Sequence, residues 1–181
     1  MKQSELGLSP WEVLHDGLSR LSGYELGTVS IFIGMIVLLL WIPMGERLGV
    51  GTILNIFLVG TVTNLTLPIV PAASQIILQL CWLVLGLAII GLGSALYLSS
   101  RLGAGPRDGL MMGFNRRTGW SIRLVRTILE AGVLAIGWLM GGSIGIGTLA
   151  FALGIGPIIQ FMFRLIGDHE LASNRIRTKP A

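Results

Sequence analysis

Three charged residues stand close together in an otherwise apolar run of the chain. Arg123, Arg126 and Glu130 lie in the segment SIRLVRTILE, with spacings of three and four residues. On a helix these spacings put the three side chains on one face, where Arg126 and Glu130 can form an ion pair. Because a carboxylate inside a membrane helix is a candidate proton carrier, one hypothesis is that Glu130 couples protons with Arg126 as its partner. The alternative is a structural ion pair whose arginines reach the lipid headgroups.

Two short segments, residues 10–21 and 106–117, begin with residues that start helices. A helix N-terminus carries free N–H groups and the positive end of the helix dipole, which favour an anionic ligand. Two such ends at matching positions predict a shared site for an anionic or polar solute. The alternative is that both segments are amphipathic surface connectors whose acidic residues only cap their own helices. The residues concerned are Ser9, Pro10 and Glu12 in the first segment, and Gly105, Pro106 and Asp108 in the second.

Motifs of known enzyme classes do not accompany these residues. The sequence contains no HEXXH pattern, no nucleophile elbow, no phosphate-binding loop and no cysteine cluster. His15 and His169 have no second ligand at metal-binding spacing, and Cys81 is the single cysteine. We therefore expect a protein that is not an enzyme and that holds no metal and no cofactor.

The composition is that of a membrane protein. Of the 181 residues, 52% are hydrophobic and 12% are charged, whereas soluble domains carry about 25% charged residues. No charged residue lies within 26–45 or 48–100, and Glu130 is the only one within 127–163. A helix needs roughly 20 apolar residues to cross a bilayer. These intervals predict five spans, near residues 26–43, 50–69, 75–99, 121–140 and 146–164.

The chain also resembles itself after a shift of 96 positions. Glycine, proline and arginine residues keep one register across the shift, which chance matching of apolar runs does not explain. Each unit contains a short segment followed by two spans; repeat one covers residues 6–69 and repeat two covers 75–165, including its leading span. The matched residues include Gly7 with Gly103, Pro10 with Pro106, Gly17 with Gly113, and Arg20 with Arg116.

The distribution of basic residues predicts the orientation in the membrane. If the short segments do not cross, most basic residues fall on one side, which the positive-inside rule makes cytoplasmic. The C-terminus is then cytoplasmic, with residues 166–181 as a disordered tail, and three crossings separate matching points of the two units, so the units are inverted. That side receives Arg47, Arg101, Arg107, Arg116, Arg117, Arg123, Arg126, Arg164, Arg175, Arg177 and Lys179, and the other side receives Lys2 and Arg20.

The fold expected from these patterns is an all-α, polytopic membrane helix bundle. It is a single membrane domain over residues 1–165, built as two inverted repeats, each with a short re-entrant or interfacial helix plus transmembrane spans. Five spans and a cytoplasmic C-terminus place the N-terminus outside, and the incomplete first repeat leads us to expect a further span upstream of Met1 in a longer form of the chain.

Four stretches resemble the YczE/YyaS/YitT-type bacterial integral membrane proteins, with the YczE-like branch the most similar. They are LGLSPWEVLHDGLS, GVGTILN, LGAGPRDGLM and RRTGWSIRLVRTILE, and the resemblance covers about residues 6–165. It implies a multi-pass protein of the bacterial inner membrane, and it carries no catalytic residue onto this chain.

Two classes of function remain open. The first is a small secondary transporter or permease for a small polar or anionic solute. The second is a non-transporting accessory that regulates or organises a partner. The expected partners are the lipid bilayer and either a second copy of the chain or a membrane protein, and not nucleic acid, because the basic residues gather in connecting segments. Arg20 and Arg116 are expected to cap the ends of their short helices or to bind lipid phosphate.

Overall fold

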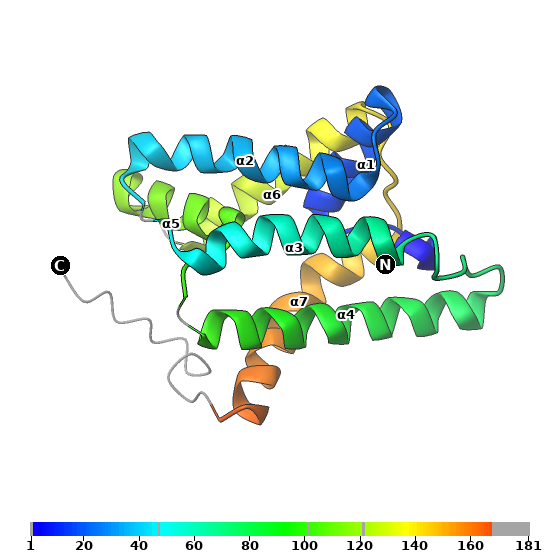
Figure 1. Ribbon diagram of the computed structural model, residues 1–181. Helices are drawn as coiled ribbons and strands as arrows, with labels where there is room; N and C mark the ends of the chain where they lie inside the picture. Colours follow the sequence, from blue (N-terminus) through cyan, green and yellow to red (C-terminus); the bar gives the residue numbers. More distant parts are fainter. Residues whose placement is uncertain (1, 47, 101, 121, 168–181) are drawn as a thin grey trace.

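The computed structural model of the protein is all-helical over the residues that it describes, which are 2–46, 48–100, 102–120 and 122–167 (Figure 1). The expected tail of residues 166–181 lies outside them apart from its first two positions. The helices are η1 (Lys2–Ser4), α1 (Pro10–Ser22), α2 (Leu26–Met44), α3 (Val50–Thr66), α4 (Ile76–Ser99), α5 (Pro106–Thr118), α6 (Ile122–Leu139) and α7 (Ile146–Leu165).

Every span and short segment expected from the sequence is a helix in the structure, with similar bounds. The largest difference is at α3, which ends at Thr66 rather than near residue 69. Leu67 still has helical backbone dihedrals, with φ of −58° and ψ of −40°, and the chain continues from α3 into turns that contain Pro68. The short helices α1 and α5 each have 13 residues, a length of about 20 Å, which is too short to cross about 30 Å of hydrocarbon.

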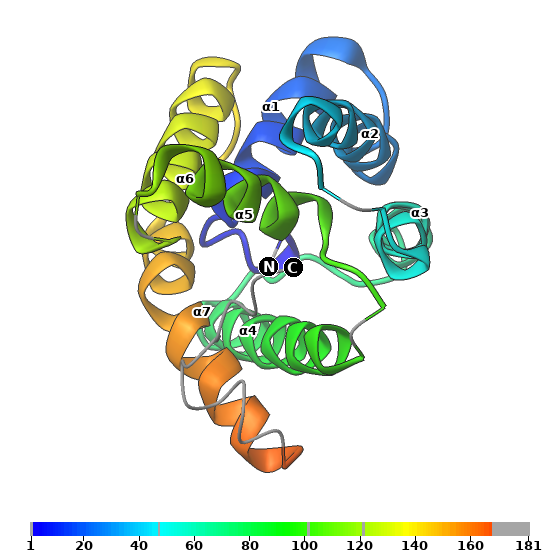
Figure 2. The same cartoon turned by 90° about the vertical axis from the view of Figure 1, so that its left-hand side faces the viewer.

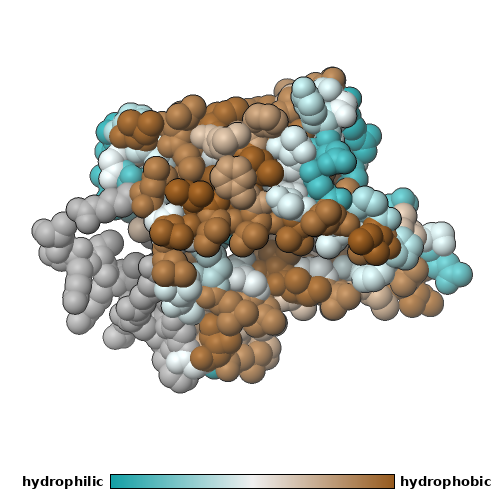
Figure 3. Space-filling view, in the orientation of Figure 1, coloured by the Kyte–Doolittle hydropathy of each residue, from teal (hydrophilic) through white to brown (hydrophobic). Residues whose placement is uncertain are grey.

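Three of the longer helices, α2, α4 and α7, are long and apolar enough to cross a membrane. The apolar helix α3 has 17 residues, and α6 carries three charged residues within its 18. On the face shown in Figure 3, hydrophobic residues form a broad belt across the middle of the molecule, and hydrophilic residues gather toward its two ends. This distribution is the one that a bilayer requires of the surface it covers.

The two short helices lie at opposite ends of the bundle. In Figure 1, α2, α3 and α4 run nearly parallel, with α1 at one end and α5 at the other, and Figure 2 looks along these helices with α5 in front. Each short helix packs on a long helix from the other half of the chain: α1 packs on α6, and α5 packs on α2. The chain runs through α2 and α6 in opposite directions.

Two close backbone crossings hold the halves together. At the first, the carbonyl of Leu6 accepts a hydrogen bond of 2.6 Å from the N–H of Gly147. Gly7 has a φ of +119° there, and a Cβ on it would lie 2.7 Å from the backbone nitrogen of Gly145. Only glycine combines this left-handed backbone with so close an approach.

The second crossing is formed by the residues that are equivalent to those of the first after the shift of 96 positions. The carbonyl of Leu102 accepts a hydrogen bond of 3.0 Å from the N–H of Gly51. Gly103 has a φ of +126°, and a Cβ on it would lie 2.8 Å from the Cα of Gly49. Both glycines of the sequence motif LG, Gly7 and Gly103, therefore serve the same steric purpose.

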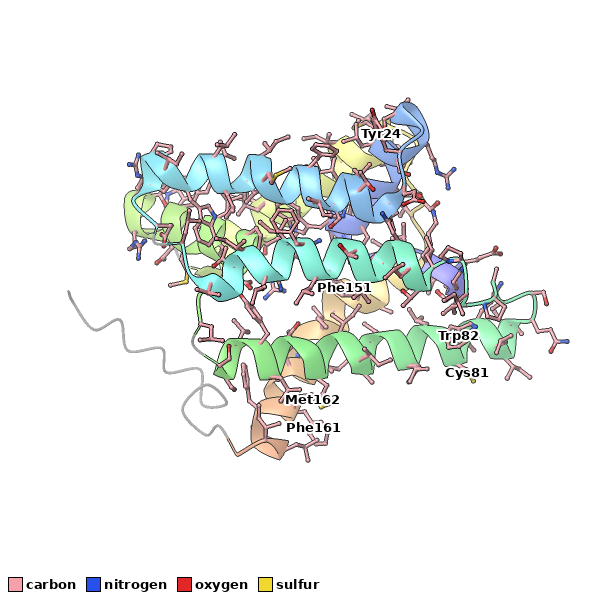
Figure 4. The ribbon with its side chains drawn as sticks, in the orientation of Figure 1. Tyr24, Cys81, Trp82, Phe151, Phe161 and Met162 are labelled. Carbon is pink, nitrogen blue, oxygen red and sulfur yellow. The ribbon has the colours of Figure 1, made fainter. Side chains whose placement is uncertain are left out.

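Apolar side chains fill two regions of the interior. The first, between α1, α2 and α5, contains Trp11, Trp41 and Leu110, with Leu129 of α6 packed against it. The second lies between α4 and α7, where Phe151, which Figure 4 labels, packs near Leu83 and Leu87. The first region surrounds the starts of both short helices, and the second attaches α7 to α4.

At the α1 end of the bundle, Asp16 joins three parts of the chain. Asp16 is a buried residue, with 2% of its surface exposed. Its carboxylate accepts hydrogen bonds from Lys2 Nζ and from Arg20 Nε, the second at 3.2 Å. It also accepts bonds from the backbone N–H and the hydroxyl of Ser143, at 3.0 and 2.9 Å. Burial raises its pKa, but the bonds from Lys2 and Ser143 outweigh burial and leave the pKa below its usual range.

At the α5 end, Arg116 forms an ion pair with Glu46, and Arg117 donates a hydrogen bond to the carbonyl of Pro43. Arg20 and Arg116 thus both bind the connection that follows the long helix beneath them, Arg20 through the hydroxyl of Ser143. Among the described residues the bonded partners of both arginines are side chains of the protein.

Gly137 on α6 is predicted to be essential for the packing of α1. A Cβ on Gly137 would lie 2.4 Å from the backbone nitrogen of Leu14, so Gly137→Ala must displace backbone and is expected to cost about 1–3 kcal/mol. Thermal unfolding in detergent should show a lower Tm. Gly132→Ala on the same helix is the control, because nothing lies within 4 Å of that Cβ. Equal Tm values for the two variants would contradict the packing described above.

Asp16→Asn is predicted to destabilise the protein at neutral pH, by about 1–3 kcal/mol, because an amide cannot accept all of the bonds that the carboxylate accepts. Since the pKa of Asp16 is lower in the folded than in the unfolded chain, its contribution is complete above the unfolded pKa and is lost as the pH falls through the folded pKa. The Tm difference from the parent protein should therefore shrink in acid. Glu25→Gln, at an exposed residue, is the control; a parent-like Tm for Asp16→Asn at pH 7 would refute the prediction.

Candidate functional site

The start of α1 is closed by its own side chains. The Ser9 hydroxyl accepts a hydrogen bond from the N–H of Glu12 at 3.4 Å, and the Glu12 carboxylate accepts one from the N–H of Ser9 at 3.1 Å. This reciprocal capping box satisfies two N–H groups at the start of the helix, those of Ser9 and Glu12. Pro10 occupies the first helical position, where its missing N–H costs nothing. The alternative interpretation from the sequence, that Glu12 caps its own helix, is correct for α1.

The start of α5 has the same backbone plan without the side-chain cap. Gly105 occupies the cap position and makes no side-chain hydrogen bond, and Pro106 is the first helical residue. Asp108 stands where Glu12 stands in α1, but it forms no capping bond to Gly105 among the described residues. The carbonyl of Pro106 accepts a hydrogen bond of 3.0 Å from the indole N–H of Trp41, which fixes this end of α5 on α2.

A contact between Arg107 and Trp11 brings the two helix starts together. The guanidinium carbon of Arg107 lies 5.1 Å from the centre of the Trp11 ring, which is within range of a cation–π interaction. The Arg107 charge also interacts electrostatically with Glu12 and with His15 of α1. The beginning of α5 therefore faces the beginning of α1 across the apolar region that surrounds Trp11.

Helix α6 adds an ion pair to this meeting point. Arg126 Nε and Glu130 Oε1 are 2.9 Å apart, and the two side chains are 44% and 23% exposed. Glu130 interacts electrostatically with Arg107 and Asp108, and Arg126 with Asp108. The Arg123 side chain lies outside the described residues. We refer to Glu12, Arg107, Asp108, Arg126 and Glu130 together as the polar cluster.

Burial shifts the proton equilibria of the groups on the short helices. It raises the pKa of Asp108, and Glu130 adds to the shift, while Arg126 and Arg107 oppose it without reversing it. It also lowers the pKa of Arg107, against the opposing carboxylates. The pKa of His15 falls to about 3 because of burial and the Arg107 charge, so His15 is neutral at physiological pH. Among these groups Asp108 is the one whose burial favours binding of a proton.

One further polar group lies beside the start of α5. The hydroxyl oxygen of Tyr97, from α4, is buried and has no hydrogen-bond partner among the described residues. A Cβ on Gly105 would lie 3.0 Å from this oxygen and 3.3 Å from Asp108 Oδ2. Both oxygens therefore lie close to one point, and the absence of a side chain at Gly105 leaves them room.

The structure brings together most of the site residues proposed from the sequence. The capped start of α1, the uncapped start of α5 and the pair on α6 meet at one place. Sequence reasoning missed Arg107, Tyr97 and Trp11 as members of the site, since Arg107 was counted only as a topology signal. A signal was present, because Arg107 lies next to Asp108 at the start of the second short segment. The proposed residues that meet here are Ser9, Pro10, Gly105, Pro106, Asp108, Arg126 and Glu130.

The chemistry open to the polar cluster is the binding of protons and small polar groups. No group of three or more histidine, cysteine, aspartate or glutamate side chains suited to a metal ion occurs among the described residues. The cluster instead combines guanidinium groups, carboxylates and one uncapped helix N-terminus. Because charges interact strongly away from water, the gain or loss of one proton or ion there changes the electrostatic energy of every charged group in the cluster.

Comparison with known proteins assigns the chain to a family. Residues 1–164 match the family described as "Family of unknown function (DUF6198)". An "Uncharacterized protein" of Haemophilus influenzae is 40% identical over 163 residues, which are 90% of this chain and 75% of the relative. The "Uncharacterized membrane protein YczE" of Bacillus subtilis is 37% identical over 159 residues, 86% of this chain and 73% of the relative.

A third relative, the "Uncharacterized protein YyaS" of Bacillus subtilis, is 28% identical over 177 residues, 96% of this chain and 88% of the relative. No solved structure matches the chain. The resemblance expected from the LG-x-x-P motifs is thus confirmed over nearly the whole sequence, and the chain belongs to the DUF6198 family of YczE-like proteins.

Proposed function

We propose that this protein is a small secondary transporter of the bacterial inner membrane that moves a small polar or anionic solute. The observation that supports the proposal most directly is the meeting of two short-helix N-termini with the charged residues of α6. Interrupted helices whose N-termini meet at the interface between two halves of a protein are the arrangement that secondary transporters use for solute binding. The contact between Arg107 and Trp11, 5.1 Å across, lies at that interface.

Five helices are assigned as spans in this proposal: α2, α3, α4, α6 and α7. Three of them have the length and composition of a span, and the relative YczE is named as a membrane protein. For α3 and α6 the support is position, since α3 packs along α2, and α6 packs on both short helices. Glu130 lies eight positions into α6, about 12 Å along the helix, which places it near the middle of the hydrocarbon layer.

The two halves are proposed to be inverted repeats. Two observations support this: the backbone crossings at Gly7 and Gly103 involve equivalent residues of opposite halves, and the chain passes through α2 and α6 in opposite directions (Figure 1). An inverted pair of short helices can open toward either side of the membrane by the same motion, which is the basis of alternating access. The ion-paired contacts of Asp16 and of Arg116 then lie at opposite membrane surfaces, the second of them cytoplasmic.

One observation favours the alternative, a non-transporting accessory that binds a membrane partner. On α7, Ile155 is 4% exposed and belongs to the region packed against α4. Its equivalent on α3, Val59, is 50% exposed, and the neighbouring Val62 is 51% exposed. In the membrane this face of α3 is available to another apolar helix, whether from a partner or from a second copy. The same surface suits lipid, so we rank this function second.

A cysteine-accessibility scan over residues 104–118 tests the transporter proposal. Cys81 is an exposed free cysteine on α4 (Figure 4), so its replacement by serine gives a background without other thiols. Single cysteines would be treated with impermeant thiol reagents in right-side-out and in inside-out vesicles. We expect the half-buried positions near Asp108 and Met111 to react from both sides, because water enters the site from each side in turn. Ser22→Cys, at the α1 end, is the control and should react from the outside only.

The opposite pattern would overturn the proposal. If residues 104–118 react from the cytoplasmic side only, and with a helical periodicity that follows exposure, then α5 is a surface connector. The accessory function would then lead, and purification of a partner that contacts α3 would be the next measurement.

A further inference from the structure

Asp108 differs from the other carboxylates of the polar cluster in having no bonded partner among the residues that the structure describes. Glu130 is ion-paired with Arg126 at 2.9 Å. Glu12 accepts the backbone N–H of Ser9 in the capping box. Asp108 forms neither an ion pair nor a side-chain hydrogen bond with any described residue. A half-buried carboxylate in that state is poorly stabilised as an anion, because hydrogen bonds to the charged form are what lower a carboxyl pKa.

The titratable and charged groups around Asp108 come from each element near it. Arg107 is its neighbour on α5, Arg126 and Glu130 face it from α6, and Tyr97 faces it from α4. On α1, Glu12 and His15 interact with Arg107. The α2 residue at this end of α5 is Trp41, which bonds to Pro106 and carries no charge.

Space for a change of state at Asp108 comes from Gly105. Its missing side chain leaves the Asp108 carboxylate and the buried Tyr97 hydroxyl near one point, 3.3 and 3.0 Å from where a Cβ would be. In the first half of the chain the equivalent position is Ser9, whose hydroxyl fills the same place as a helix cap. The two halves thus share a backbone plan, and in the described part of the second half a carboxylate and a hydroxyl have no hydrogen-bond partner.

We propose that Asp108 is the proton-binding group of this protein, while Glu130 remains ion-paired to Arg126 and Glu12 remains the cap of α1. A proton from hydronium binds one Asp108 carboxylate oxygen and leaves water, and its release reverses the reaction with no other bond formed or broken. This assignment moves the proton-carrying role from Glu130, the residue first suggested by the sequence, to Asp108. The direction of the Asp108 pKa, raised by burial, agrees with it.

Protonation of Asp108 would also change its neighbour. With the carboxylate neutral, the positive charge of Arg107 and the uncapped N-terminus of α5 lose one of the negative charges that offset them, and their attraction for an anionic group increases. By linkage, a bound anion would equally favour the proton on Asp108. This consequence rests on the proposed transport function and describes symport of an anion with a proton, whereas protonation itself can be measured without any transport.

The test is infrared spectroscopy of the purified full-length protein in lipid during a pH titration, which follows the C=O stretch of protonated carboxyl groups. The parent protein should show one carboxyl that titrates above the ordinary range of aspartate, and Asp108→Asn should lose that signal. Asp108→Glu, which keeps a carboxyl, should retain it with a shifted midpoint. Arg107→Gln should move the midpoint upward, because the guanidinium favours the ionised form.

Glu130→Gln is the matched control and should leave the signal present. The proposal is overturned if the signal survives in Asp108→Asn, or if it disappears in Glu130→Gln while Asp108→Asn behaves like the parent. Tm values of each variant show whether the protein is folded, and the retained signal of Asp108→Glu covers the case in which the amide variant does not fold. Because no solute is required, this result is independent of the cysteine scan, and the transport proposal can fail while the protonation is confirmed, or the reverse.

Discussion

The structure depends on two places where the backbone of one half crosses that of the other with no side chain between them. At these crossings Gly7 meets Gly145 and Gly103 meets Gly49, each joined by a hydrogen bond from the following turn of helix. The crossings set where α1 and α5 begin, and therefore which long helix each one packs against. A side chain at Gly7 or Gly103 would require both a strained φ and a wider separation of backbones, so the position of the polar cluster depends on them as well.

The starts of α1 and α5 are packed alike, but their side chains differ in chemistry. At the start of α1, serine and glutamate complete a capping box, which bonds the backbone N–H groups of Ser9 and Glu12. At the start of α5, glycine and aspartate at the equivalent positions leave the end without a side-chain cap, and the carboxylate bonds to none of the described residues. The cost of that arrangement is the loss of a cap, which in other helices is worth about 1 kcal/mol. A loss of this kind at one end only is typical of a site that has kept local strain or unmet bonds for function.

The apolar surroundings explain why a small number of charged groups has a large electrostatic effect in this protein. Most large apolar side chains of α2, α3 and α4 face outward, where a bilayer accepts them at no cost. Charged groups are kept at the two ends, in the bonds of Asp16 and of Arg116, or in the polar cluster. Within the cluster the positive charges of the arginines and the negative charges of the carboxylates offset one another. Each proton gained or lost therefore changes the electrostatic energy of the cluster more than it would in water.

How much of this could be predicted from the sequence follows from the range of the interactions involved. Helix positions, the short segments, the 96-residue register and the Arg126–Glu130 pair depend on local patterns of polarity, on glycine and proline, and on spacings within one helix, so the sequence alone determined them. The bonds of Asp16 with Ser143 and of Arg116 with Glu46, and the contact of Arg107 with Trp11, join residues far apart in the chain. The approach of Tyr97 to Asp108 joins two different helices, α4 and α5. Only the tertiary structure decided those, because packing of α1 on α6 and of α5 on α2 brings such residues together, and no local pattern records which helix faces which.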